Sequence, residues 1–207
     1  ENATILYQPI INFNTQKITG YESFTHGPKK TIFEIPYCLF SFASENGLSH
    51  ELDWLCKKKI IEKAKNINKD YQLFIKSLPE SIQKSSIKSD SLQNLLKEYD
   101  IKPENIVLEI SDKSIINNAT AYSKFSDLYN GISKAVVIND SWSDNEINDL
   151  INIDISYIKI SMDLIRNIDT DQKKQERIKK IGEISLWINL WDIVRLFCWK
   201  PVYLNPW

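Results

Sequence analysis

The chain has 207 residues, of which 43% are hydrophobic and 26% charged, and its formal net charge is −1. This length supports one sizeable core, and the composition is that of an ordinary soluble globular domain. The balanced charge argues against a nucleic-acid polymer or an anionic membrane surface as a partner. The five glycines form neither of the Gly-rich loops GxGxxG and GxxxxGK[ST], which excludes these common nucleotide-binding motifs.

The cysteine, histidine and methionine contents bear on the cellular compartment, on possible metal sites and on the extent of the domain. Three widely spaced cysteines favour a reducing compartment without disulfides, so we expect a cytoplasmic protein. Two histidines are too few for a recognisable Cys/His zinc site. No apolar run approaches the ~20 residues that span a bilayer, so we expect no membrane contact within this segment. The only methionine is Met162, and we interpret residues 1–207 as a single domain excised from a longer protein.

The predicted elements begin with a hairpin. Apolar runs at 5–13 and 18–24 flank a polar turn and are interpreted as its two strands. Apolar residues at helical spacing then predict helices over 31–46 and 51–66.

From residue 71 onward, short apolar runs alternate with helical stretches. The runs lie at 71–75, 105–110, 134–138, 157–160, 184–190 and 202–204. The predicted helices lie at 79–87, 92–99, 119–130, 144–151, 171–181 and 192–197. Apolar strands that alternate with helices are typical of a parallel sheet covered by helices. This number of repeats favours closure, so we predict an α/β fold with a TIM-like (β/α) barrel.

The active site of a (β/α) barrel lies at the carboxyl ends of its strands. The polar residues at the ends of the predicted strands are Glu22, Lys76, Glu109, Asn139, Asp140 and Lys159. Carboxylate oxygens hold Mg²⁺ or Mn²⁺, the metal activates a water, and a lysine balances phosphate charge. The set therefore indicates divalent-metal phosphate chemistry at one mouth of the barrel.

Five segments, in chain order, resemble those of the EAL domain family, the cyclic diguanylate phosphodiesterases. They are YQPIINFNTQKITGYESF, GLSHELDWLC, LFIKSLPES, NIVLEISD and VVINDSWSDNEINDLINIDISYIKIS. The resemblance is close from residue 7 to about 159 and weaker beyond. It implies a barrel of the EAL type, modified or incomplete at its C-terminal end, in a bacterial signalling protein.

Some of the family's functional residues have counterparts here. By the resemblance, Glu22 and Glu109 match metal-binding glutamates, and Asp140 matches the second aspartate of a metal-binding pair. Lys159 matches a lysine that contacts phosphate or the metal-bound water.

Other positions depart from the family's pattern. Lys76 stands where the family has a metal-binding asparagine, and Asn139 stands where it has a bridging aspartate. His26 replaces an arginine that contacts the ligand, and Ser141-Trp142 replaces Phe-Gly.

The C-terminal part departs most. No glutamate follows Glu183 and no glutamine follows Gln175, whereas active members carry an EGxE segment and a late glutamine. In our alignment Ile188 and Trp191 replace the two glutamates, and Lys200 replaces the glutamine.

These departures predict that the chain is not an enzyme and uses no cofactor, where the family would use Mg²⁺ or Mn²⁺. On this interpretation it is a degenerate domain that contacts a protein partner or forms a homodimer, with weak cyclic diguanylate binding at most. The loop 141–145 is a candidate for that contact. The alternatives are a receptor that binds cyclic diguanylate without cleaving it and a residual metal-dependent phosphodiesterase.

The lysine at position 76 suggests a specific hypothesis. An ammonium between Glu22 and Glu109 would satisfy both carboxylates and repel a divalent cation, so Lys76 is predicted to be a tethered surrogate for the metal. The competing interpretation is that Glu22, Glu109, Asp140 and Lys159 form an inherited ion-pair cluster that caps the barrel.

Overall fold

The computed structural model describes residues 3–12, 15–65, 67, 70–78, 90–111, 118–187 and 193–194. Its strands are β1 (Thr4–Ile11), β2 (Ile18–His26), β3 (Gln72–Ser77), β4 (Ile106–Ile110), β5 (Ser133–Ile138), β6 (Tyr157–Ile160) and β7 (Ile193–Val194). Its α-helices are α1 (Pro36–Glu45), α2 (Ser49–Ala64), α4 (Asp90–Glu98), α6 (Ala119–Leu128), α7 (Asp144–Asp149), α8 (Met162–Ile165) and α9 (Gln172–Trp187). Short 3₁₀ turns are η1 (Ile32–Glu34), η2 (Pro103–Asn105) and η3 (Leu150–Asn152).

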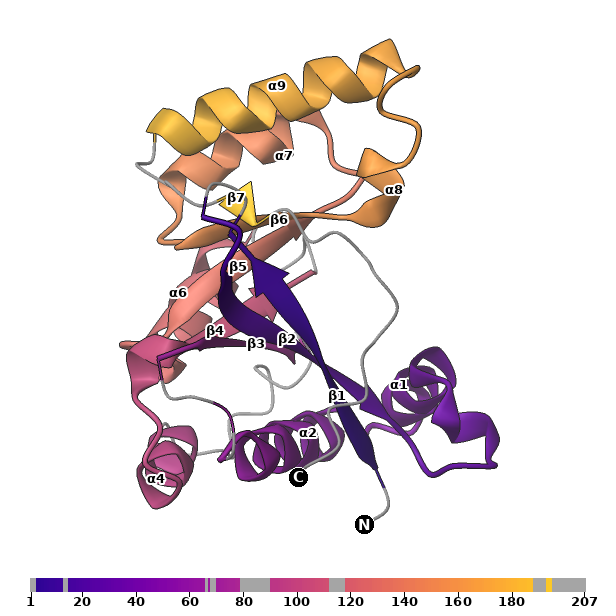
Figure 1. The fold of residues 1–207 in the computed structure, drawn as a ribbon, viewed down its shortest axis with the longest axis vertical. Helices are drawn as coiled ribbons and strands as arrows, with labels where there is room; N and C mark the ends of the chain where they lie inside the picture. Colours follow the sequence, from indigo (N-terminus) through magenta and orange to yellow (C-terminus); the bar gives the residue numbers. More distant parts are fainter. Residues whose placement is uncertain are drawn as a thin grey trace.

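The strands form one sheet whose order in space is the order in the chain, β1 to β7. β1 and β2 pair antiparallel as the predicted hairpin. Every later neighbour pair, from β2–β3 to β6–β7, is parallel. The parallel part curls like one side of a barrel (Figure 1), so the predicted α/β architecture built on a parallel sheet is confirmed.

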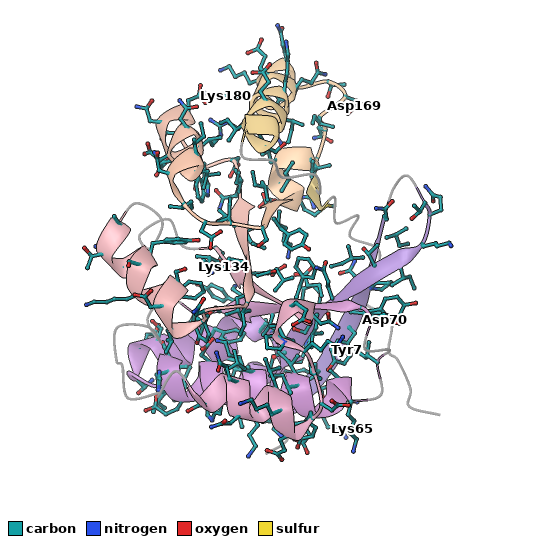
Figure 2. The ribbon with its side chains drawn as sticks, turned by 90° about the vertical axis from the view of Figure 1, so that its left-hand side faces the viewer. Tyr7, Lys65, Asp70, Lys134, Asp169 and Lys180 are labelled. Atoms are coloured by element: carbon teal, nitrogen blue, oxygen red, sulfur yellow. The ribbon has the colours of Figure 1, made fainter. Side chains whose placement is uncertain are left out.

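Helices cover the outer face of this sheet in two groups. α2 and α4 lie at one end of the molecule, and α7, α8 and α9 lie at the other, with the sheet between them (Figure 1). Figure 2 shows Lys180 of α9 and Lys65, which follows α2, at these opposite ends. α1 lies beside the hairpin and contacts α2 (Figure 1).

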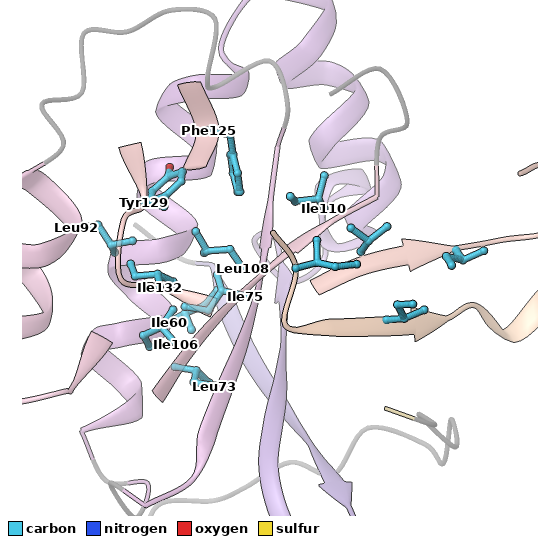
Figure 3. Close-up of a cluster of buried hydrophobic side chains, with 14 of the residues drawn as sticks. Ile60, Leu73, Ile75, Leu92, Ile106, Leu108, Ile110, Phe125, Tyr129 and Ile132 are labelled. Atoms are coloured by element: carbon cyan, nitrogen blue, oxygen red, sulfur yellow. The ribbon is translucent and has the colours of Figure 1, made fainter. Parts of the chain in front are cut away.

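The two faces of the sheet carry different side chains because side chains alternate along a strand. On the helix-covered face, strand residues such as Ile75 and Leu108 pack with Ile60 of α2 and Phe125 of α6, all 3% exposed or less (Figure 3). The opposite, concave face carries a small second cluster of buried residues: Ile10, Phe74, Val107 and Ala135, with Tyr157 packed against them. This cluster forms a floor inside the curl.

Some predicted boundaries were wrong. The helix predicted at 31–46 is split into η1 and α1, because Pro36 fits the first position of a helix and holds Ile35 extended. The run 184–190 was predicted as a strand, but α9 continues to residue 187. β7 falls inside the helix predicted at 192–197. The predictions at 79–87 and 202–204 lie outside the described residues.

Among the described residues, no helix is both long enough and apolar enough to cross a membrane.

Candidate functional site

A pocket of about 430 Å³ opens on the concave face, at the carboxyl ends of the strands. Four of the six predicted site residues line it: Glu22, Lys76, Glu109 and Lys159. Its wall includes residues from α1 and α2 as well as from the strands. The position is that of the active site in a (β/α) barrel.

Strand register brings these side chains together. Lys76 pairs with Glu109 across β3 and β4, and Lys159 pairs with Val137 across β6 and β5. Lys76, Glu109 and Lys159 each lie two residues after a residue of the floor. Their side chains therefore point from the same face of the sheet, one layer closer to the carboxyl ends of the strands. The strands thus place Lys76, Glu109 and Lys159 above the apolar floor, with Glu109 and Lys159 largely shielded from water and Lys76 exposed.

Glu22, Glu109 and Lys159 form an ion-pair group, here named the charged cluster. The Lys159 ammonium donates to Oε1 of Glu22, and to Oε1 and Oε2 of Glu109 at 2.9 and 3.1 Å. The three side chains are 9%, 5% and 13% exposed for Glu22, Glu109 and Lys159. A lysine has three N–H donors, so all of them are accounted for by the two glutamates.

Burial and mutual charge set the protonation of this cluster. Burial and, to a smaller extent, the charge of Glu109 raise the pKa of Glu22 to about 7, against the opposing effects of Lys159 and Lys76. Burial lowers the pKa of Lys159, but the charges of Glu109 and Glu22 outweigh burial and raise it overall. Burial thus makes Glu22 hold its proton unusually well, whereas the two nearby carboxylates keep Lys159 charged.

Lys76 lies at the pocket but has a different contact. Its Nζ is 6.0 Å from the centre of the Phe40 ring of α1, a cation–π distance. Its charge lowers the pKa of Glu22, so it lies within electrostatic reach of the cluster. The hydrogen bonds to both glutamates come from Lys159, however, and a surrogate role for Lys76 stays a prediction.

Asn139 and Asp140 do not line the pocket. The Asn139 carboxamide oxygen accepts from the backbone N–H and the hydroxyl of Ser141, at 2.9 and 2.6 Å. The Asp140 carbonyl accepts from Arg177 of α9 at 2.6 Å. Both residues are thus part of the turn that leads from β5 to α7.

Other predicted differences fall outside the pocket. His26 Nδ1 lies 3.1 Å from the carbonyl oxygen of Glu34, a contact that fits a role in the local turn. Trp142 is 1% exposed and belongs to the main core. Ile188, Trp191 and Lys200 lie outside the described residues.

The sequence analysis missed a buried ion pair beside the pocket. Asp53 and Lys57 of α2 are 2% and 1% exposed and form a salt bridge one helical turn apart. Asp53 Oδ1 also accepts from Leu78 N at 3.0 Å, and Lys57 donates to Ser77 Oγ at 3.2 Å. The pair therefore ties α2 to the end of β3, next to Lys76. The i, i+4 spacing of opposite charges was the available signal, but a solvated helix face gives the same signal.

The sequence analysis also missed the aromatic side of the pocket. Pro36, Tyr37 and Phe40 of α1 line it, and Tyr37 is 79% exposed. The pocket thus combines charges on the strands with aromatic rings on a helix.

Comparison with known proteins identifies the fold. The family model described as "EAL domain" matches residues 1–186. No curated protein matches the sequence. A standalone versatile EAL protein from Vibrio cholerae O395, in its c-di-GMP-bound form, is 25% identical, with a TM-score of 0.75 over 91% of this chain and 78% of that one.

Two further structures share the fold at 16% identity. The PaMucR phosphodiesterase in complex with c-di-GMP has a TM-score of 0.74, over 92% of this chain and 83% of that chain. Klebsiella pneumoniae BlrP1 in a complex with manganese and cyclic diguanylate has a TM-score of 0.76, over 94% of this chain and 54% of that one.

Two predictions are contradicted by these findings. The prediction that the chain is not an enzyme was wrong, because the matched family is enzymatic and its structural relatives include a phosphodiesterase. The expectation of no cofactor was also wrong, because BlrP1 is seen with manganese or calcium alongside the dinucleotide, which points to metal use in this fold. In the part of the chain that the structure describes, no three His, Cys, Asp or Glu side chains gather as a metal site.

The two glutamates nevertheless fit a divalent cation by their chemistry. Mg²⁺ is commonly held by one or two carboxylates together with substrate phosphates. Glu22 and Glu109 supply two such carboxylates, already converging on one cation, the Lys159 ammonium. The family match over residues 1–186, together with a barrel that carries this cluster at its strand ends, shows that the chain belongs to the EAL domain family.

Proposed function

We propose that this domain binds cyclic diguanylate in the concave pocket and cleaves its phosphodiester with the help of a divalent cation. The observation that carries the proposal is the charged cluster, which puts two carboxylates and an ammonium in a pocket at the strand ends. The ligand is suggested by the c-di-GMP-bound relative that is 25% identical. Widely spaced cysteines suit a reducing compartment, so we place this activity in a bacterial cytoplasm.

Each part of the pocket has a chemical task in this proposal. Glu22 and Glu109 would hold the cation, which supplies charge stabilisation and an activated water. Lys159 and Lys76 offer positive charge to the phosphates. Tyr37 and Phe40 offer ring faces on which nucleobases stack.

Hydrolysis is tested directly by incubating the protein with cyclic diguanylate and Mn²⁺ and following the linear product by chromatography. Glu109→Gln is expected to lower the rate by about 10²-fold or more, because it removes the charge that holds the cation.

Glu104→Gln is the matched control, since Glu104 is exposed on η2, outside the pocket. It is expected to leave the rate unchanged. If calorimetry shows saturable binding and the nucleotide stays intact, the domain is a receptor and not a phosphodiesterase. The absence of binding would show that cyclic diguanylate is not the ligand of this pocket.

We also propose that the domain contacts a second copy of itself through the surface before and along α1. Large apolar side chains are exposed there: Ile32 is 67% exposed and Ile35 is 58% exposed. Apolar groups this close together on a surface mark interaction sites. Contact between two copies would regulate the pocket, because α1 also supplies Tyr37 to the pocket wall.

The double variant Ile32→Ser/Ile35→Ser is expected to convert a dimer into a monomer in light scattering coupled to gel filtration. Ile151→Ser is the control, since Ile151 is 48% exposed on η3, which is not part of this surface. A wild-type protein that is monomeric at every concentration would contradict the contact.

A further inference from the structure

In the arrangement that the structure shows, the Lys159 ammonium cannot donate a hydrogen bond to a phosphate. Its three N–H donors match three glutamate oxygens: Oε1 of Glu22 and both oxygens of Glu109. A phosphate ligand would need at least one of these donors. Lys159 must therefore leave at least part of the charged cluster before it donates to an anion in the pocket.

A divalent cation needs the same carboxylate oxygens. Metal ions and ammonium groups both bind carboxylates at short range, and two cations at that range repel each other. Glu22 and Glu109 are 9% and 5% exposed, so water screens this repulsion weakly. Lys159 and a metal ion therefore compete for the two glutamates.

The surroundings allow Lys159 to move. Its side chain lines the pocket, and its four-carbon stem is flexible, so the ammonium can swing from the glutamates into the open volume. Glu22 and Glu109 lie on strands of the sheet, whose backbone pairing holds them in place when the ammonium leaves.

We propose that Lys159 is a switch between metal and ligand: it holds Glu22 and Glu109 as a tethered cation in the metal-free protein, and a divalent cation displaces it toward the ligand phosphate. This inference rests on the proposed metal-dependent reaction and adds a coupling to it. Because binding linkage is reciprocal, the metal strengthens dinucleotide binding and the dinucleotide strengthens metal binding by the same factor.

The first test measures Mn²⁺ alone, without nucleotide, by calorimetry. Lys159→Met is expected to raise Mn²⁺ affinity by at least ~10-fold, since it removes the competing ammonium. Lys102→Met is the matched control, because Lys102 is exposed before η2 and lies outside the pocket, and it is expected to change the affinity by less than ~3-fold. Unchanged or weaker Mn²⁺ binding in Lys159→Met would overturn the switch.

Removing Lys159 leaves two unpaired carboxylates, so a second variant and a wild-type measurement guard against misfolding. Lys159→Gln keeps a neutral donor and is expected to raise Mn²⁺ affinity as well, with circular dichroism reporting the fold. In the wild-type protein, Mn²⁺ is expected to increase acetylation of Lys159 several-fold relative to the exposed Lys76, as read by mass spectrometry. Acetylation of Lys159 that stays constant while Mn²⁺ binds would contradict its displacement.

These experiments test the proposed switch and the proposed substrate independently. If Mn²⁺ displaces Lys159 but cyclic diguanylate does not bind, the switch holds and the proposed substrate fails. If cyclic diguanylate is cleaved while Lys159→Met leaves Mn²⁺ affinity unchanged, the proposed function holds and the switch fails.

Discussion

Replacing Lys57 by methionine is expected to lower the free energy of unfolding by about 3–5 kcal/mol. The variant removes the salt-bridge partner of Asp53, which is 2% exposed, and leaves a buried carboxylate without a counter-ion. Burial lowers the pKa of Lys57, but Asp53 more than compensates and raises it overall, so the native pair is charged. Urea-induced unfolding followed by tryptophan fluorescence measures the loss.

Two further variants separate charge pairing from packing. Lys58→Met changes an exposed lysine on the same helix and is expected to stay within about 0.5 kcal/mol of the wild type. The double variant Asp53→Asn/Lys57→Met removes both charges yet keeps an oxygen for Leu78 N, and it is expected to recover most of the stability. A double variant as unstable as Lys57→Met alone would show that the methionine does not fit, and that the buried charge is not the cause.

Replacing Trp142 by alanine is the second large effect, with an expected loss of about 3–5 kcal/mol. The side chain is 1% exposed and belongs to the main core, although it lies in the turn between β5 and α7. Ser143 begins α7 with a capping box to Glu146, so the turn is fixed by hydrogen bonds as well as by the buried ring. Thermal and urea unfolding report the loss.

Ile151→Ala is the control for this truncation. Ile151 is 48% exposed on η3, close to Trp142 in sequence, and its shortening is expected to change stability by less than about 0.5 kcal/mol. A Trp142→Ala protein of wild-type stability would mean that the turn is held without its tryptophan. The loop 141–145 would then stay a candidate for a partner contact that rearranges the tryptophan.

The fold was largely predictable because its strands are short apolar runs separated by helices. Runs such as 105–110 and 157–160 match β4 and β6 closely. The failures have local causes: Pro36 breaks one predicted helix, and α9 continues to Trp187, through residues that the apolar run from 184 had placed in a strand. A short apolar run does not by itself distinguish a buried helix from a strand.

The sequence predicted which site residues lie at the ends of strands, but it did not predict the contacts between their side chains. Glu22, Lys76, Glu109 and Lys159 meet in one pocket because parallel strands end on the same side. The sequence could not decide which lysine binds the glutamates, because that depends on strand curvature and side-chain reach. Asn139 and Asp140 sit at a strand end too, yet hydrogen bonds in the turn after β5 account for their placement.

The match between chain order and spatial order in the sheet has a consequence for synthesis on the ribosome. Among the residues that the structure describes, each strand pairs with its neighbours in chain order and with no other strand. Each parallel pairing therefore closes a single connection between neighbouring strands, and it needs no strand that is made later. The hairpin of β1 and β2 therefore provides a template as soon as it emerges, and each later strand can add to a finished edge while translation continues.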